Sequence, residues 1–241
     1  MTRLTQLFML CLAACLLAGS AVADQFTPAQ RAEIVQILRD ALKKDPSILR
    51  DAVAALQADE GDQQKAKIAA LGDKLINPAD PVAGNPKGDV TIVEFFDTRC
   101  PYCRKLEPAM EQLLETDHGV RLVYKDLPIL GPASVLGSRA LLAAQKQDGY
   151  EKLRAAIMSA PPQATEAMIK DAAVRLGLDW PRLKHDMDDP SVAARIDANL
   201  KLARSIGVDG TPALVIGGDL LPGAVELADL RDAVAGARKG K

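Results

Sequence analysis

The sequence predicts an α/β fold that carries an inserted helical subdomain and follows an N-terminal helical segment. Residues 91–96 and 120–125 are β-type runs, and a helical run from Cys100 to about residue 115 separates them. A strand, a helix and a strand at this spacing indicate a parallel pair joined by a right-handed crossover. Residues 133–206 have helical periodicity almost throughout, which predicts the insertion.

The start of the chain is typical of a secretory signal peptide over residues 1–23. Arg3 gives a basic start, residues 7–17 are an apolar run too short to span a bilayer, and residues 21–23 read Ala-Val-Ala. We expect cleavage near Ala23 and export to a bacterial periplasm, where disulfides persist. Cys11 and Cys15 would leave with this leader; lipoprotein-type cleavage at Cys15 is the alternative.

Length and charge limit the number of domains and the kinds of partner that the chain can have. The chain has 241 residues and a formal net charge of −2, enough for one domain of ordinary size and an appendage. No block of basic residues interrupts it, which argues against a nucleic-acid partner.

The N-terminal helical segment is expected over residues 24–77. Thr27, Pro28 and Gln30 have the spacing of a capping box with proline in the first turn, and Pro46 separates two helices. The apolar stripes are narrow, and they consist of Ile34, Ile37, Leu38, Ala41, Leu42, Leu49, Val53, Leu56, Ile68, Leu71 and Leu75. A narrow stripe usually needs a partner, so we expect self-association; the alternative is packing against the chain's own domain.

A polar stretch around Gly61 and Asp62 interrupts the apolar phase of these helices and is a candidate hinge. Residues 78–88 are rich in Pro and Gly and are interpreted as a linker. The second domain is expected over residues 89–241. Its last elements are a strand at 213–216, a Gly-Gly hairpin turn to a short strand, and a closing helix at 226–235.

The most informative motif is Cys100-Pro101-Tyr102-Cys103, the only cysteines expected in the mature chain. Two cysteines spaced in this way after a strand and at the start of a helix indicate a thiol-disulfide redox site. Backbone N–H groups and the helix dipole stabilise a thiolate there. We expect Cys100 to be the nucleophile, with the lowered pKa and the greater exposure. Cys103 is then the resolving thiol.

A structural disulfide and a metal site are weaker alternatives for these cysteines. A structural disulfide closing a two-residue loop would gain little from chain entropy. A closed zinc site takes four ligands, and neither His118 nor His185 has metal-ligand spacing. We therefore expect no metal and no cofactor. Tyr102 either helps to set the redox poise or is an exposed ring of little influence.

Glu94 is a charge in an otherwise apolar strand. If both faces of the sheet are covered, its carboxyl group is buried and must be protonated or paired. The alternative is a position on a solvated edge. Arg99, Arg104 and Lys105 are interpreted as solvated surface charges, and Trp180 is expected to pack within the helical subdomain.

Over residues 82–236 the chain resembles the DsbA family of thioredoxin-fold oxidoreductases. The resemblance is carried by Glu94-Phe95-Phe96, Cys100-Pro101-Tyr102-Cys103, Gly210-Thr211-Pro212, Ile216-Gly217-Gly218 and Pro222-Gly223-Ala224. The N-terminal segment is similar to suppressor-of-copper-sensitivity proteins of the ScsC type. That similarity is carried by Phe26-Thr27-Pro28, Ile34, Asp45-Pro46-Ser47-Ile48-Leu49 and Ala54-Ala55-Leu56-Gln57.

The resemblance implies several properties. It implies a cis bond before Pro212, with the backbone of Thr211 pairing to an extended substrate; an ordinary trans turn is the alternative. It implies that Glu94 lies beneath Cys103 and exchanges a proton with it. It also implies a homotrimer, with a dimer as the alternative. We expect exported client proteins with cysteines or disulfides, and either a membrane thiol reductase or a quinone-linked oxidase as electron partner.

Three functional hypotheses follow. The first is an oligomeric disulfide isomerase or reductase acting by thiol-disulfide exchange. The second is a monomeric disulfide donor, and the redox direction between these two is not fixed by the sequence. The third is a copper-binding or holdase module whose cysteines only bind.

Overall fold

The structure is a computed structural model that describes residues 26–161 and 165–240. The expected signal peptide and its two cysteines lie outside these residues. The chain divides into two compact units between Asp59 and Glu60.

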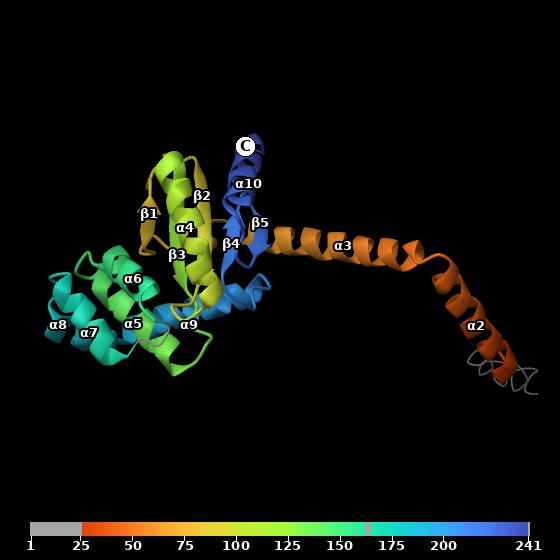
Figure 1. The fold of residues 1–241 in the computed structure, drawn as a ribbon, viewed down its shortest axis with the longest axis horizontal. Helices are drawn as coiled ribbons and strands as arrows, with labels where there is room; N and C mark the ends of the chain where they lie inside the picture. Colours follow the sequence, from red (N-terminus) through yellow and green to blue (C-terminus); the bar gives the residue numbers. More distant parts are fainter. Residues whose placement is uncertain (1–25, 162–164, 241) are drawn as a thin grey trace, which may run out of the picture. The chain divides into compact units, whose positions relative to one another are not determined.

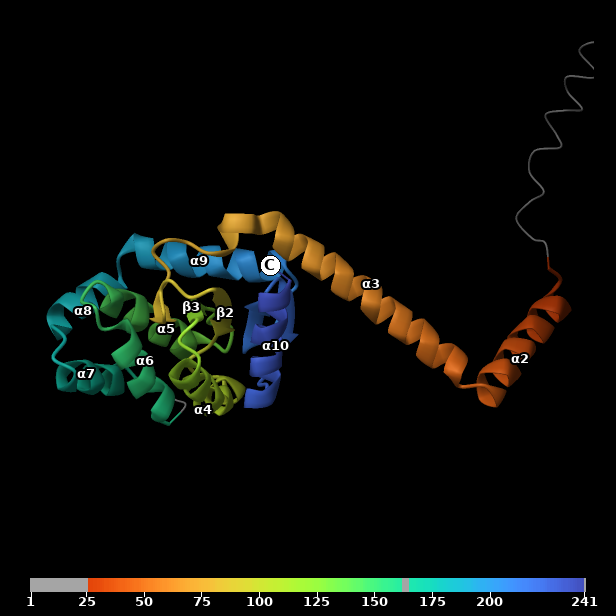
Figure 2. The same ribbon diagram turned by 90° about the horizontal axis from the view of Figure 1, so that it is seen from above.

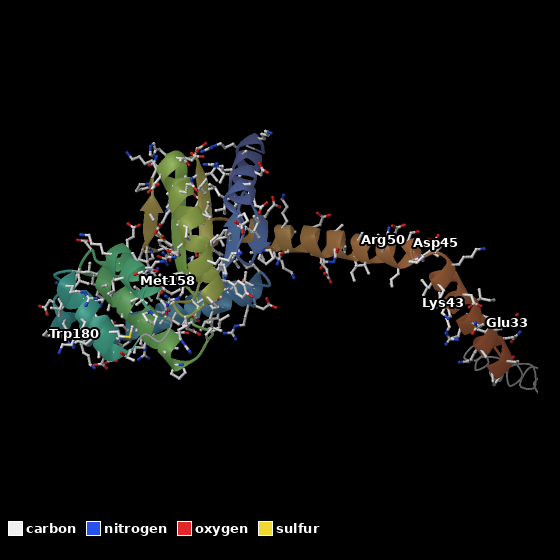
Figure 3. All side chains as sticks on the ribbon, in the orientation of Figure 1. Glu33, Lys43, Asp45, Arg50, Met158 and Trp180 are labelled. Atoms are coloured by element: carbon white, nitrogen blue, oxygen red, sulfur yellow. The ribbon has the colours of Figure 1, made fainter. Side chains whose placement is uncertain are left out.

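The first unit contains α2 (Pro28–Lys44) and the beginning of α3 (Ser47–Leu71). The predicted capping box is confirmed: Gln30 N donates to Thr27 Oγ1 at 3.3 Å, and Thr27 N donates to Gln30 Oε1 at 2.8 Å. No residue of α2 is buried. Charged side chains such as Glu33 and Lys43 project from this helix (Figure 3). The polar stretch at residues 61–62 lies inside α3 and does not interrupt the helix.

The second unit is built on a mixed sheet with the order β1-β3-β2-β4-β5. Its strands are β1 (Val82–Gly84), β2 (Val90–Phe96), β3 (Val120–Asp126), β4 (Ala213–Ile216) and β5 (Asp219–Pro222). The predicted parallel pair is β2 and β3, and the other neighbours are antiparallel. Strand β1 lies within the predicted linker. The sequence analysis did not predict it, because three residues are too few to show a recognisable alternation.

Helices cover this sheet and form the insertion (Figure 1). The segment η1 (Gly72–Leu75) is a 3₁₀ turn, and the α-helices are α4 (Pro101–Thr116), α5 (Pro132–Gln145), α6 (Tyr150–Ser159), α7 (Glu166–Arg175), α8 (Trp180–Met187), α9 (Pro190–Ser205) and α10 (Leu227–Lys239). Helices α5 to α9 confirm the predicted helical insertion. Trp180 begins α8 and packs against the core of this subdomain, as expected (Figure 3).

Each face of the sheet has its own core. Ile92 and Phe96 of β2 point to the side of α4, α10 and the insertion, whereas Val93 and Phe95 point to the opposite side. On that opposite side the last turns of α3 lie beside α9 (Figure 2). The sheet is therefore buried on both faces.

Residues 60–77 belong to this second unit, although the sequence placed them in the N-terminal segment. Ile68 is 4% exposed in the second core, and Gln64 Nε2 donates to the Ile206 carbonyl at 3.0 Å. Their helical stripe resembles that of residues 26–59, so periodicity alone does not show the change of partner. Within the described ranges, no helix combines the length and apolar character needed to cross a bilayer.

Candidate active site

Cys100 is the N-cap residue of α4, and Pro101 occupies the first helical position. The Cys100 backbone N–H donates to the Asp97 carbonyl at 3.0 Å, which turns the chain from β2 into the helix. Cys103 follows one turn later. Both cysteines are free thiols.

The loop before β4 meets this turn from 111 residues away. The Cys100 sulfur lies 3.1 Å from the Thr211 carbonyl oxygen, to which it donates a hydrogen bond when it is protonated, and the Thr211–Pro212 bond is cis, as the resemblance implied. Gly223 donates its N–H to the Pro212 carbonyl at 2.8 Å. Its φ of +80° is a conformation that glycine adopts readily, which explains the glycine of the Pro-Gly-Ala motif.

Cys100 is the more exposed of the two cysteines, as expected, but both are buried. Cys100 is 3% exposed and Cys103 is 0% exposed, whereas Tyr102 between them is 62% exposed. The Thr211 carbonyl lies against the Cys100 sulfur and shelters it. A reacting sulfur must therefore reach a sulfur that is almost fully buried.

The two thiols differ strongly in acidity. The hydrogen bond from the Cys103 thiol is the largest of the causes that lower the pKa of Cys100 to about 5. Burial opposes this, while the Thr211 side chain and the backbone N–H groups of Cys103 and Tyr102 add to it. The same thiol–thiolate bond, with burial, raises the pKa of Cys103 far above its ordinary value. Helix position contributes, but the neighbouring thiol contributes more.

Glu94 lies on the same face of β2 as Ile92 and Phe96 and is 1% exposed, so the solvated-edge alternative does not apply. Neither carboxylate oxygen accepts a hydrogen bond from a described residue. Burial raises the pKa of Glu94 to about 7, Arg154 opposes this, and Glu107 adds to it. The Glu94 charge in turn raises the pKa of Cys103.

Arg154 of α6 is a residue of this site that the sequence analysis missed. Its guanidinium forms two hydrogen bonds with Glu107, at 2.5 and 2.8 Å, and lies 3.6 Å from Glu94 Oε2. The signal was present: Arg154 follows Tyr150 by four residues and so lies on the apolar face of its helix.

Asp126 is a second buried carboxyl that the sequence analysis missed. It alternates with Leu122 and Tyr124 on β3 and is 0% exposed. Its Oδ2 accepts a hydrogen bond from the Tyr150 hydroxyl at 2.8 Å, and burial raises the pKa of Asp126 to about 7. A polar residue in the period-two pattern of a buried strand was the available signal.

Arg104 is not a solvated surface charge, as the sequence had suggested. Its guanidinium donates to the carbonyls of Thr98, Met158 and Ala160 and joins the active-site turn to the end of α6. The described residues contain no group of three or more His, Cys, Asp or Glu side chains placed to hold a metal ion. The chemistry available at the site is that of a dithiol with one acidic and one strongly basic sulfur.

Comparisons with known proteins agree with this geometry. Residues 91–235 match the family described as DSBA-like thioredoxin domain. Residues 30–63 match the family described as Copper resistance protein ScsC N-terminal domain.

Solved structures similar to this chain include a thioredoxin-like oxidoreductase from Silicibacter pomeroyi, with 44% identity and a TM-score of 0.68. The match covers 70% of this chain and 98% of that one. A linker-deletion mutant of Proteus mirabilis ScsC has 30% identity and a TM-score of 0.67, covering 91% and 100% of the two chains.

Curated relatives include the thiol:disulfide interchange protein DsbA of Bordetella parapertussis. It is 28% identical over 148 residues, which are 59% of this chain and 69% of the relative. The chain also matches the Na(+)/H(+) antiporter NhaA 3 of Salinispora tropica, with 31% identity over 68% of this chain. It spans only 26% of the antiporter's length. The family match covers more than half of the sequence and includes both cysteines, so the chain belongs to the DSBA-like thioredoxin-domain family.

Proposed function

We propose that this protein is a periplasmic thiol-disulfide oxidoreductase that acts as an oligomeric isomerase or reductase on exported proteins. The observation that carries the proposal is the pair of opposed thiols at the start of α4. Cys100 is a thiolate at neutral pH, Cys103 is not, and the Thr211 backbone lies beside the reacting sulfur.

In the proposed reaction, the Cys100 thiolate attacks one sulfur of a client disulfide. A Cys100–client S–S bond forms, and the other client sulfur leaves as a thiolate. If Cys103 loses its proton and attacks Cys100, the Cys100–Cys103 disulfide forms and the client is reduced. If a client thiolate attacks instead, a new client disulfide forms and the Cys100 thiolate is regenerated, which is isomerisation.

Two neighbours assist this exchange. Glu94 accepts the proton of Cys103 when Cys103 resolves the mixed disulfide; its free oxygens and near-neutral pKa support this role. The Thr211 backbone pairs with an extended client segment next to Cys100. Pro101 and Tyr102 form the first turn of α4, which presents the sulfur, and Pro212 shapes the opposing loop.

The oligomer is proposed to be a homotrimer formed by residues 26–59. This unit has no core of its own among its described residues, and nine of its large apolar side chains are 44–62% exposed. They are Phe26, Ile34, Val35, Ile37, Leu38, Ile48, Leu49, Val53 and Leu56. The match to the ScsC N-terminal family also supports the proposal. Several catalytic units facing one client raise the local thiol concentration.

Solution mass and refolding of a scrambled multi-disulfide protein test the proposal together. The full mature chain is compared with Leu38→Glu and Leu56→Glu, and Gln57→Glu is the control for added charge. We expect a trimer for the parent and control. The two variants should be monomers with at least about fivefold slower refolding but unchanged reduction of a small disulfide.

A shortened chain should begin at Glu60, because a start at Pro78 would remove Ile68 from the second core. If the parent is monomeric and all variants refold the client equally well, the oligomeric isomerase is excluded. A monomeric donor, reoxidised by a quinone-linked membrane oxidase, then remains. An isomerase or reductase would instead need a membrane thiol reductase to keep Cys100 reduced.

The copper-resistance description of the N-terminal family favours one further candidate, a copper-binding module. Exchange activity that persists with a copper chelator and is lost in Cys100→Ala would reject binding as the main role. Loss of exchange with chelator alone would favour it.

A further inference from the structure

The guanidinium of Arg154 is held rigidly inside the second unit. Besides its two hydrogen bonds to Glu107, it lies 4.1 Å from the ring centroid of Tyr124 and 4.6 Å from that of Phe96. These contacts come from α4, β3 and β2, while Arg154 itself belongs to the helical insertion. The Arg154 side chain is 6% exposed, so solvent screens its charge only weakly.

The contact between Arg154 and Glu94 has an unusual length. At 3.6 Å it is too long for a hydrogen bond but short enough for a strong charge interaction. Arg154 can therefore stabilise the Glu94 carboxylate without occupying its oxygens. A proton acceptor needs both a nearby positive charge and free oxygens. A carboxylate whose oxygens are fully hydrogen-bonded has no free lone pair for an incoming proton.

The other ionisable groups around Glu94 act in the opposite direction or on other residues. Glu107 of α4 disfavours a charged Glu94, and burial disfavours it most. Glu94 in turn raises the pKa of Cys103. Tyr124 of β3 and Glu151 of α6 belong to the same group of interacting charges. Asp126 and Tyr150 pair with each other. Among the groups facing Glu94 in the described residues, Arg154 is the cation that favours its ionised form.

We propose that Arg154 is a positioning residue that keeps Glu94 able to accept the Cys103 proton at neutral pH. The inference rests on the role of Glu94 in the proposed function. Arg154 does not touch the reacting sulfurs. Its charge acts through Glu94 when Cys103 transfers its proton and attacks the Cys100–client disulfide.

A two-phase assay on the full mature chain isolates this step. A small aromatic disulfide releases one chromogenic thiol when Cys100 attacks and a second when Cys103 resolves the mixed disulfide. The rate of each phase is measured against pH for the parent, Arg154→Met, Arg154→Lys and Glu94→Gln. Lys152→Met, which removes an exposed cation from the same helix, is the matched control.

We expect Arg154→Met to move the pH midpoint of the second phase upward by about one unit. The second phase at pH 7 should then slow about tenfold, with the first phase within twofold of the parent. Arg154→Lys should restore most of the shift, and Lys152→Met should have no effect. Adding Arg154→Met to Glu94→Gln should change neither phase further. Arg154→Gln replaces the methionine variant if that variant does not fold.

The outcomes separate two failures. If Arg154→Met slows both phases equally without a pH shift, or slows resolution in the Glu94→Gln background too, the positioning role is overturned. If Glu94→Gln itself leaves the second-phase profile unchanged, Glu94 is not the proton acceptor, and that part of the proposed function fails with it.

Discussion

Two buried carboxylates, Asp80 and Glu94, lie on opposite faces of the same sheet. They differ in the number of hydrogen bonds that they accept. On the face of α3 and α9, Asp80 accepts hydrogen bonds from Lys125 at 2.5 Å, Arg195 at 2.6 Å and the Asn77 N–H at 2.6 Å. On the face of α4 and the insertion, Glu94 accepts none from a described residue. The first carboxylate has hydrogen-bond partners for both of its oxygens, whereas the second has both oxygens free to receive a proton.

Removing the Asp80 charge should have the largest effect on the free energy of unfolding. Asp80→Asn leaves Lys125 and Arg195 without a counter-charge in a buried place. We expect a loss of about 3–5 kcal/mol in the free energy of unfolding, measured by urea denaturation. The pH profile of the second exchange phase should stay as in the parent. A shift of that profile would mean that the two groups are coupled across the sheet.

Removing the Glu94 charge should raise the free energy of unfolding, which is the opposite of the effect expected for Asp80→Asn. The Glu94 carboxyl has a folded pKa of about 7 against an ordinary value of 4.5. Between these values the unfolded chain ionises and the folded chain does not, so this group lowers stability as pH rises. Glu94→Gln should therefore stabilise the protein by about 2 kcal/mol at pH 8 and hardly at all at pH 4. Equal effects at both pH values would contradict the assignment.

Removing the Asp126 charge should also raise the free energy of unfolding at high pH. The gain should be smaller than for Glu94, because one Asp126 oxygen already accepts a hydrogen bond. In Asp126→Asn, the Tyr150 hydroxyl can still donate to the side-chain oxygen, but the new NH₂ group lacks an assured acceptor. We expect a gain of about 1 kcal/mol at pH 8, with the same sign of pH dependence. Destabilisation at pH 8 would show that the Asp126 carboxylate is ionised and contributes to stability there.

The smallest effect is expected for an exposed ion pair. Lys65 and Asp219 are 2.8 Å apart, with side chains 54% and 61% exposed. Lys65→Met should change the free energy of unfolding by less than about 0.5 kcal/mol, because solvent screens the pair. A larger loss would mean that this contact helps to hold the end of α3 on the sheet.

Local patterns were sufficient to predict most of the fold. The strand periodicity of residues 91–96 and the helical start at Cys100 predicted β2 and α4 to within a residue. The Gly217-Gly218 pair predicted the hairpin, and both glycines have the positive φ that such a turn requires. These features depend on neighbours in sequence, and so they are visible in a sequence.

Features that depend on distant partners were missed or misplaced. The sequence around Arg154 indicates only that it lies on the apolar face of its helix. Its partners Glu107, Phe96 and Tyr124 meet it only after the insertion has packed. The burial of both cysteines was not visible in the sequence, because the carbonyl of Thr211 that shelters Cys100 comes from another loop. Strand β1 was missed because pairing with β3, and not its own three residues, makes it a strand.

The burial of Cys100 has a consequence for selectivity towards reagents. A thiolate that is 3% exposed is reactive in charge but narrow in access. We therefore expect alkylating reagents to modify Cys100 more slowly than its low pKa alone would suggest, and a bulky reagent to be slowed more than a small one.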